Sequence, residues 1–178
     1  MTCWVALLYS VVLTPSRRVR SADLIDLADN LGFAAARTVL STNNLIFEAS
    51  GSEADLAARI EGEMTLIYGK AIPVLLRSAD DWRALVAVNP FPDPSRHDPA
   101  KVAVRVMRHE TDPAMMAKIA ARCGADESFA ATPRALWLAL GQQLSTSPLL
   151  RAMGAAARMG VGTWRNASAI RKIAAALD

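Results

Sequence analysis

The sequence predicts an α+β protein made of two ferredoxin-like modules, each a βαββαβ unit (an α-β plait) with helices packed on one face of an antiparallel sheet. Two observations predict this fold. The order strand, helix, strand, strand, helix and strand runs once over residues 1–77 and again, less regularly, over about 100–165. Each predicted helix also carries a single apolar stripe, as a helix on one face of a sheet requires.

The first module is predicted over residues 1–77 and opens with an apolar strand over Trp4–Leu13. A helix follows, with Ser21 as its cap and Gly32 as its stop. Strands over 36–40 and 45–49 are then joined by an asparagine-containing turn that favours a hairpin.

The second helix of this module is predicted to start at Ser52, with Asp55 completing the capping pattern, and to end at Gly69. A strand over 72–76 closes the unit near a sheet edge, because Pro73 lacks a backbone donor. The inward side chains of the helix are expected to be Leu56, Ile60, Met64 and Ile67.

Residues 78–99 are predicted to connect the modules, first as a helix capped by Ser78 and Asp81 and then as a proline-rich linker. The second module, 100–178, is predicted to contain an apolar strand, a helix capped by Thr111 or Asp112 with Pro113 at its first position, and a second hairpin turning at 132–134. The inward side chains of the helix that begins at Pro113 are expected to be Met116, Ile119, Ala120 and Cys123, and Gly124 is expected to end it. Two later helices are expected to begin at Ser147 and Asn166.

Composition points to a globular cytoplasmic protein. Apolar residues make up 52% of the chain, and Cys3 and Cys123 are the only cysteines, without CxxC spacing, which fits a reducing compartment. The apolar start has no basic residue before it and is shorter than the ~20 residues that span a bilayer, so we interpret it as a strand and expect no membrane segment.

The residue patterns that usually carry catalysis are absent, and we expect no catalytic residue, metal or cofactor. His97 and His109 lie in polar surroundings without metal-ligand spacing. The sequence has no Gly-x-Ser-x-Gly elbow and no glycine-rich phosphate loop. Cys123 is expected at the carboxyl end of a helix, where the dipole disfavours a thiolate.

Charge is distributed unevenly, although the net charge is only +3. Residues 128–177 contain six basic residues and no acid. Such a stretch could attract phosphates or acidic partners, but solvated arginines on helix surfaces are the simpler interpretation. Nucleic-acid binding is the weaker alternative, because aromatic platforms between dense basic clusters are missing.

Residues 160–166 combine glycines, Trp164, Arg165 and the amide of Asn166 at a predicted helix start, a favourable place for an anion. The simpler interpretation is a strand-to-helix turn whose tryptophan packs between the modules.

Several segments together resemble the domain of unknown function 1697 family of mostly bacterial proteins. The segments that carry the resemblance are Val5–Leu8, Leu31–Phe33, Arg37-Thr38, Asn44–Phe47, Asn89–Phe91 and Thr163–Lys172. The resemblance implies two ferredoxin-like modules and no known reaction.

The chain departs from the family pattern in its polar loops. The family's Arg-Gly-Ile-Asn-Val-Gly-Gly is replaced by Tyr9–Pro15, its Ser-Gly-Asn by Thr42–Asn44, and its Gly-Arg-Ser-Lys-like stretch has no counterpart in Gln142–Leu149. Ala167 also replaces a tryptophan. If these loops form a binding site in the family, this chain has lost the ligand or changed it.

The leading hypothesis is therefore a cytoplasmic, non-enzymatic ligand-binding or interaction module whose oligomeric state is open. The alternative is a small enzyme or a protein that binds a small anion or phosphate in a groove between the modules. Its candidate ligand-binding residues are Arg37, Asn44, Trp164, Arg165 and Asn166.

Overall fold

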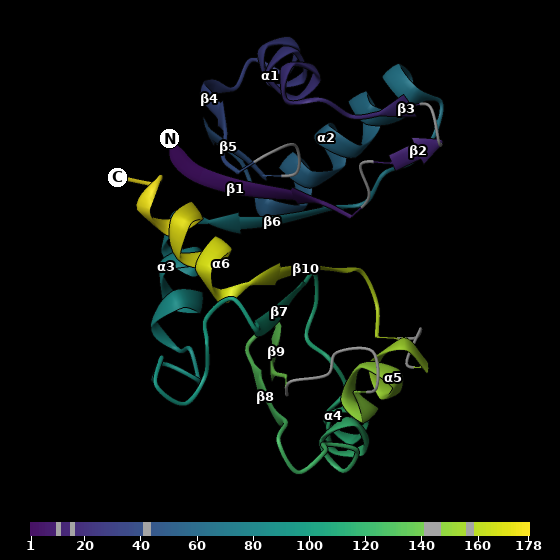
Figure 1. The fold of residues 1–178 in the computed structure, drawn as a ribbon. Coiled ribbons are helices and arrows are strands. Elements are labelled where there is room, and N and C mark those ends of the chain that lie inside the picture. Colours follow the sequence, from purple (N-terminus) through teal and green to yellow (C-terminus); the bar gives the residue numbers. More distant parts are fainter. Residues whose placement is uncertain (10–11, 15–16, 41–43, 141–146, 156–158) are drawn as a thin grey trace. The chain divides into compact units, whose positions relative to one another are not determined.

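The computed structural model describes the 178 residues except 10–11, 15–16, 41–43, 141–146 and 156–158. The described residues form two four-stranded antiparallel sheets, a two-stranded ribbon and six helices (Figure 1). They divide into two compact units: unit 1 is Met1–Ala84 with Arg171–Asp178, and unit 2 is Leu85–Ile170. An α+β fold with antiparallel sheets was predicted, and this part of the prediction is confirmed.

Unit 1 contains a sheet in the strand order β4-β5-β1-β6. Its strands are β1 (Thr2–Leu8), β4 (Ala34–Thr38), β5 (Asn44–Ala49) and β6 (Val74–Ser78), its helices are α1 (Ser21–Asn30) and α2 (Glu53–Tyr68), and its ribbon consists of β2 (Val12–Thr14) and β3 (Arg17–Arg18). The predicted first strand was too long. β1 ends at Leu8: the backbone N–H of Tyr9 still donates to Pro73 O at 2.9 Å, but Pro73 has no N–H to donate in return, so the pairing with β6 stops there.

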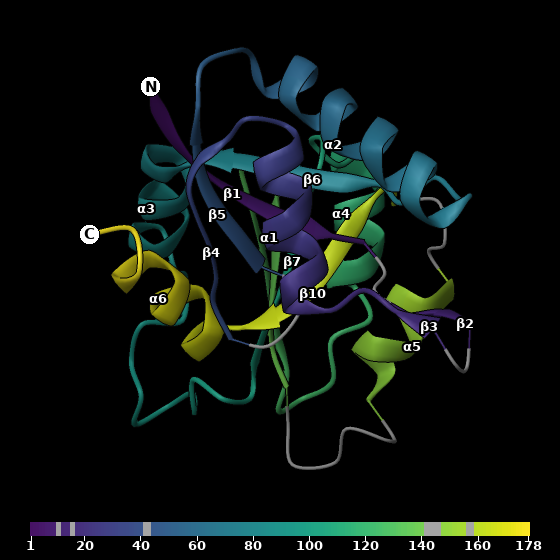
Figure 2. The same ribbon diagram turned by 90° about the horizontal axis from the view of Figure 1, so that it is seen from above.

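Helices α1 and α2 cover one face of this sheet (Figure 2). Alternate residues of β1 point into the resulting core, as the period of a strand dictates. Phe33 and Phe47 stack there with ring centroids 4.3 Å apart. The prediction of a buried Ile67 was wrong, since this side chain is 40% exposed. The core side chains from the helices are Leu24, Leu27, Ala28, Leu56, Ile60 and Met64.

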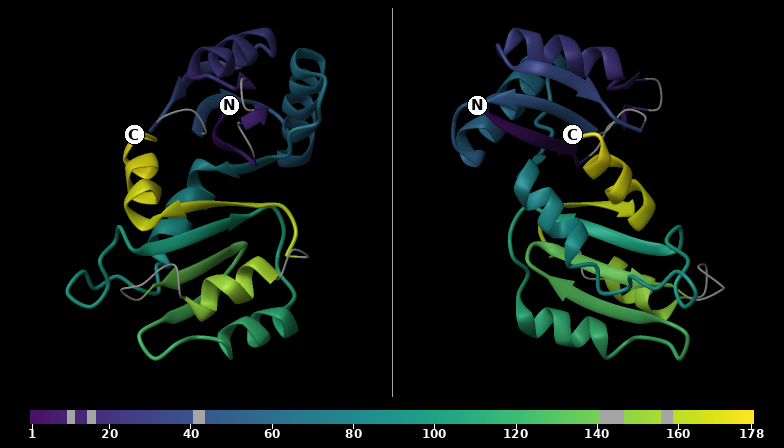
Figure 3. Two further views of the ribbon diagram at one scale, coloured as in Figure 1. Left: turned by 45° about the vertical axis from the view of Figure 1, so that its right-hand side comes forward. Right: turned by 90° about the vertical axis from the view of Figure 1, so that its left-hand side faces the viewer.

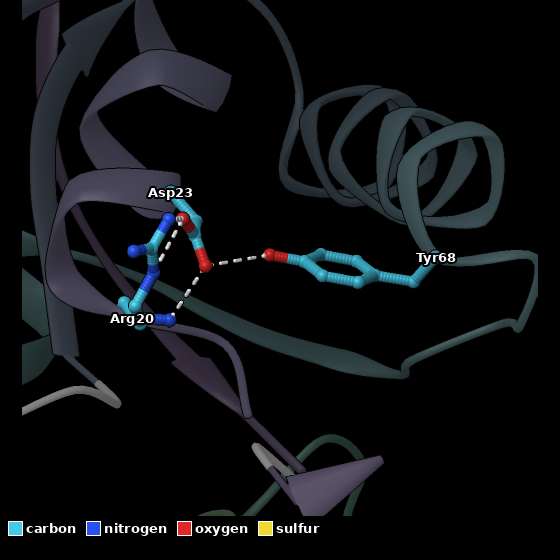
Figure 4. Close-up of polar contacts among 3 residues, drawn as sticks. All are labelled: Arg20, Asp23 and Tyr68. Carbon is cyan, nitrogen blue, oxygen red and sulfur yellow. Dashed lines mark hydrogen bonds and ion pairs between the residues drawn. The ribbon is translucent and has the colours of Figure 1, made fainter. Parts of the chain in front are cut away.

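The start of α1 differs from the prediction in its capping residue. Arg20, not Ser21, is the N-cap, because its backbone N–H donates to the Asp23 carboxylate at 2.8 Å. The guanidinium of Arg20 donates to the same carboxylate at 2.8 Å, and the Tyr68 hydroxyl donates to it at 3.1 Å (Figure 4). The hydrogen bonds from Arg20, opposed by partial burial, lower the pKa of Asp23. One carboxylate thus joins the start of α1 to the end of α2.

Other helix signals of unit 1 are confirmed. The Ser52 hydroxyl accepts from the backbone N–H of Asp55 at 3.1 Å, and Gly69 ends α2 in the left-handed region with φ 68°. Ser78 accepts from the backbone N–H of Asp81 at the start of α3 (Ala79–Ala87).

Unit 2 contains a sheet in the strand order β10-β7-β9-β8, with α4 and α5 side by side on one face (Figure 3). Its strands are β7 (Val102–Met107), β8 (Ser128–Thr132), β9 (Ala135–Ala139) and β10 (Gly162–Asn166), and its helices are α4 (Pro113–Ala120) and α5 (Pro148–Ala155). Residues 167–175 form α6 (Ala167–Ala175), which begins in unit 2 and ends in unit 1. The core between helices and sheet contains Met107, Met116, Ile119, Leu136, Leu138, Leu149, Met153 and Met159.

The predicted helix starts of unit 2 are confirmed. Asp112 accepts from the backbone N–H of Ala114 at 2.9 Å with Pro113 in the first turn, and Ser147 accepts from that of Leu150 at 2.9 Å. The predicted end of α4 was wrong. The helix stops at Ala120, before Gly124, and Ala120 is exposed rather than buried. Among the described residues, no helix has the length and apolar character needed to cross a membrane.

Candidate functional site

Two of the predicted ligand-binding residues lie in unit 1, where they donate to the backbone. Arg37 on β4 donates to Ala35 O at 3.2 Å and to Ala176 O, after the end of α6, at 2.6 Å. The Asn44 side chain is 3% exposed and donates to Val39 O at 2.8 Å. Both side chains therefore stabilise the β4–β5 hairpin and the chain that follows α6.

The other three predicted residues follow one another on β10 in unit 2. Successive side chains of a strand point to opposite faces, so Trp164 and Arg165 do not share a surface. Trp164 is 39% exposed, with the Arg105 guanidinium 5.8 Å from its ring. Arg165 is largely buried, and burial lowers its pKa to about 10. Its guanidinium donates to Thr163 Oγ1 at 3.1 Å and to Trp164 O at 2.6 Å.

Asn166 serves as a helix cap. Its side-chain oxygen accepts from the backbone N–H of Ala169 at 2.7 Å, in the first turn of α6. The altered polar loops that were expected to mark a changed site, at residues 10–11 and 15, 42–43 and 142–146, lie outside the described residues.

Sequence reasoning missed a groove between α4 and α5 of unit 2. Its volume is about 760 Å³, in the range typical of ligand sites. It is lined by Met115, Lys118, Ile119, Arg122, Pro148, Arg151 and Ala152.

Helical periodicity explains why these residues line one groove. On α4, Met115 and Ile119 are one turn apart, and Lys118 lies beside them at the edge. On α5, Pro148 and Ala152 repeat the same spacing, with Arg151 at the edge. The floor is therefore made of two apolar pairs from facing helices.

A buried carboxylate fixes the α5 side of the groove. Glu127, 9% exposed, accepts from the backbone N–H of Leu149 at 3.2 Å, from that of Gly124 at 2.8 Å and from the Ser147 hydroxyl. It thereby satisfies donors at the start of α5, where a negative charge is favoured.

The rim of the groove carries charge of one sign. Lys118, Arg122 and Arg151 are all exposed, and none of the described lining residues is acidic. The nearby carboxylate of Glu127 is occupied by the three donors named above. Three cations around an apolar floor raise the local concentration of anions and favour a ligand with an apolar part.

A second, smaller cavity of about 360 Å³ in unit 2 is less suited to one ligand class. It mixes basic and acidic side chains, and Asp98 already accepts from the backbone N–H of Ala100 at 2.9 Å. Its lining consists of Pro94, Ser95, Arg96, His97, Asp98, Lys101, Val102, Asp126, Ala139 and Leu140.

The described residues offer little for metal or thiol chemistry. They contain no group of three His, Cys, Asp or Glu side chains that could hold one metal ion. Burial raises the pKa of Cys3 and of Cys123, which keeps both as thiols rather than nucleophilic thiolates at neutral pH.

The fold and the groove together define a two-unit α+β protein with a cation-rimmed surface on its second sheet unit. The chain belongs to the family described as protein of unknown function (DUF1697), whose model matches residues 1–137. Its structure is similar to that of the conserved bacterial protein SP0830 from Streptococcus pneumoniae, with a TM-score of 0.79, 19% identity and 99% of each chain covered. At this identity the likeness shows the fold alone. No curated protein matches the chain, and neither description states a function.

Proposed function

We propose that this protein is a non-enzymatic binding module that holds an anionic, partly apolar ligand or partner in the groove of unit 2. The observation that carries the proposal is the combination of apolar floor and cationic rim at Lys118, Arg122 and Arg151. An apolar floor supplies affinity through the burial of apolar surface. The exposed cations select a ligand or partner of negative charge.

The second proposal, which we rank lower, is a small enzyme or a protein that binds a small anion. Its site would be formed by Arg37, Asn44, Trp164, Arg165 and Asn166. Polar atoms of Arg37, Asn44 and Asn166 contact the chain's own backbone. Such contacts explain why these residue types occur at these positions without a ligand.

For the fold, we propose that both units are ferredoxin-like and derive from a duplication, with modules at 1–77 and 100–178 joined by 78–99. The two sheets support this, since each places its first and third strands in the centre and its second and fourth strands at the edges. We also propose a cytoplasmic location, which the two free cysteines support.

The binding proposal is tested with octanoate, which joins a carboxylate to an apolar tail. Acetate supplies the charge alone and octanol supplies the tail alone. We expect octanoate to shift the backbone amide NMR signals of residues 115–122 and 148–152, and to do so at lower concentration than either partial probe. Shifts confined to other residues, or equal responses to all three probes, would contradict the proposal.

A charge-reversed variant locates the site. Arg122→Glu/Arg151→Glu should weaken octanoate binding by about tenfold, because two rim attractions become repulsions. The matched control is Arg171→Glu, which reverses an exposed basic residue on α6 that is not part of the groove lining and should leave binding unchanged. Equal loss in both variants would indicate a general charge effect.

A further inference from the structure

Resting on the proposed function, we propose that the natural occupant of the α4–α5 groove is an acidic amphipathic helix of a partner protein. In this inference, apolar side chains of that helix contact the groove floor, and Asp or Glu side chains on either flank contact Lys118, Arg122 and Arg151.

The shape of the groove favours a helix over a small molecule. Lys118, Arg122, Pro148 and Arg151 are exposed, so the groove is open to solvent on both of its helical sides. A small ligand typically requires burial of about 70–90% of its surface, which an open groove does not provide. An amphipathic helix needs only one face covered, and its other face stays in water.

The spacing of the floor residues fits the same occupant. Met115 with Ile119, and Pro148 with Ala152, form apolar pairs one helical turn apart on facing helices. A helix with apolar residues at i, i+4 and i+7 presents side chains at the matching period of about 5.4 Å per turn.

The charges of the groove favour a partner helix of negative charge. The described lining contributes three cations and no acid. A basic helix would place like charge beside Lys118 and Arg122, which costs binding free energy.

The lining argues for a protein partner rather than a nucleic acid. None of the described residues that line the groove is aromatic. Single-stranded nucleic acids gain much of their affinity by stacking bases on aromatic rings, and an aliphatic floor offers no such platform.

The experiment uses fluorescently labelled model peptides of about 20 residues, long enough to fold as a helix. The first carries leucine at i, i+4 and i+7 repeats flanked by glutamate. In the second every glutamate is lysine, and in the third every leucine is serine. Fluorescence anisotropy with the full chain should show saturable binding of the first peptide, and at least about tenfold weaker binding of the other two.

Protein variants then locate the complex. Arg122→Glu/Arg151→Glu should weaken binding of the acidic peptide by at least about tenfold and restore binding of the lysine peptide, whereas Arg171→Glu should change neither. Circular dichroism checks that each variant is folded. If Arg151→Glu disturbs the fold, Lys118→Glu/Arg122→Glu tests the same rim without a change on α5.

The outcomes separate this inference from the proposed function. Octanoate binding in the groove without binding of the acidic peptide would overturn the helix occupant and leave the binding module intact. Loss of both would overturn both. Three other results would also overturn the acidic helix as occupant. The first is equal binding of the lysine peptide. The others are displacement of the acidic peptide by a single-stranded oligonucleotide, and a concentration-dependent dimer whose formation needs the groove.

Discussion

The two units share a strand order but differ in how their helices cover the sheet. In unit 1, α1 and α2 are joined by side-chain contacts: Tyr68 donates to Asp23, and the Arg59 guanidinium donates to Leu31 O at 2.6 Å while lying 4.9 Å from the Phe33 ring. In unit 2, α4 and α5 leave a groove of about 760 Å³ with cations on its edges.

The difference shows that one strand order can carry two kinds of helix layer: helices joined by side-chain contacts in unit 1, and helices that flank a groove in unit 2. α2 is 16 residues long, whereas α4 is 8 residues long. A longer helix spans more of the sheet and contributes more core residues.

The largest expected effect compares the buried cores of the two units. Phe47→Ala in unit 1 removes a fully buried ring stacked on Phe33 and should lower the free energy of unfolding by about 4 kcal/mol. Met153→Ala on α5 should cost about 2 kcal/mol, because residues next to an open groove can relax. Urea unfolding of both variants measures the difference, and equal losses would contradict the contrast.

The second effect concerns the anchor of α5. Glu127→Gln keeps the shape of the side chain but removes the charge that two backbone N–H groups and the Ser147 hydroxyl contact, and should cost about 2–3 kcal/mol. Ser147→Ala removes the helix cap and should cost about 1 kcal/mol. Thermal and urea unfolding check both values. A neutral Glu127→Gln variant would show that the carboxylate does not hold the helix.

The third effect compares helix caps of the two units and tests a candidate ligand residue. Asn166→Ala should cost about 1 kcal/mol, close to the cost of Ser52→Ala in unit 1. Asn166→Asp retains the side-chain acceptor and should be near neutral. Urea unfolding measures all three variants. If Asn166→Ala leaves stability unchanged, capping does not explain this asparagine, and the second proposal gains weight.

The smallest effect is the pH dependence of the α1–α2 contact. The pKa of Asp23 lies below its usual value of 3.8, so its contribution to stability is fully present above pH 3.8 and is lost as pH falls through the lower, folded-state pKa. The effect is small because the Arg20 side chain is 78% exposed. Acid titration of the unfolding midpoint, compared between the native chain and Asp23→Asn, should show less acid destabilisation in the variant.

Local signals in the sequence were sufficient to predict much of the fold. Ser52, Ser78, Asp112, Ser147 and Asn166 all act as the predicted caps, because a cap depends only on residues within one turn. Arg20 was missed because arginine has no side-chain acceptor of the usual N-cap kind, and its backbone N–H and guanidinium instead donate to the Asp23 carboxylate.

Features that depend on contacts between distant parts of the chain could not be predicted from the sequence. The periodicity of α2 placed Ile67 on the buried face, but periodicity does not reveal where the covering neighbours end. The groove was missed for the same reason. Arg151 lay in the noted acid-free stretch, yet Lys118 and Arg122 precede that stretch, and only packing of α4 beside α5 brings the three together.

Glu127 also has a consequence for mutational surveys of binding. It does not line the groove, yet it holds the first turn of the helix that carries Arg151. A substitution at this position would change the distance between the groove walls without removing any group that touches the occupant. A deep mutational scan for binding should therefore contain a strong signal at a buried acid behind the surface, and that signal would report wall geometry rather than recognition.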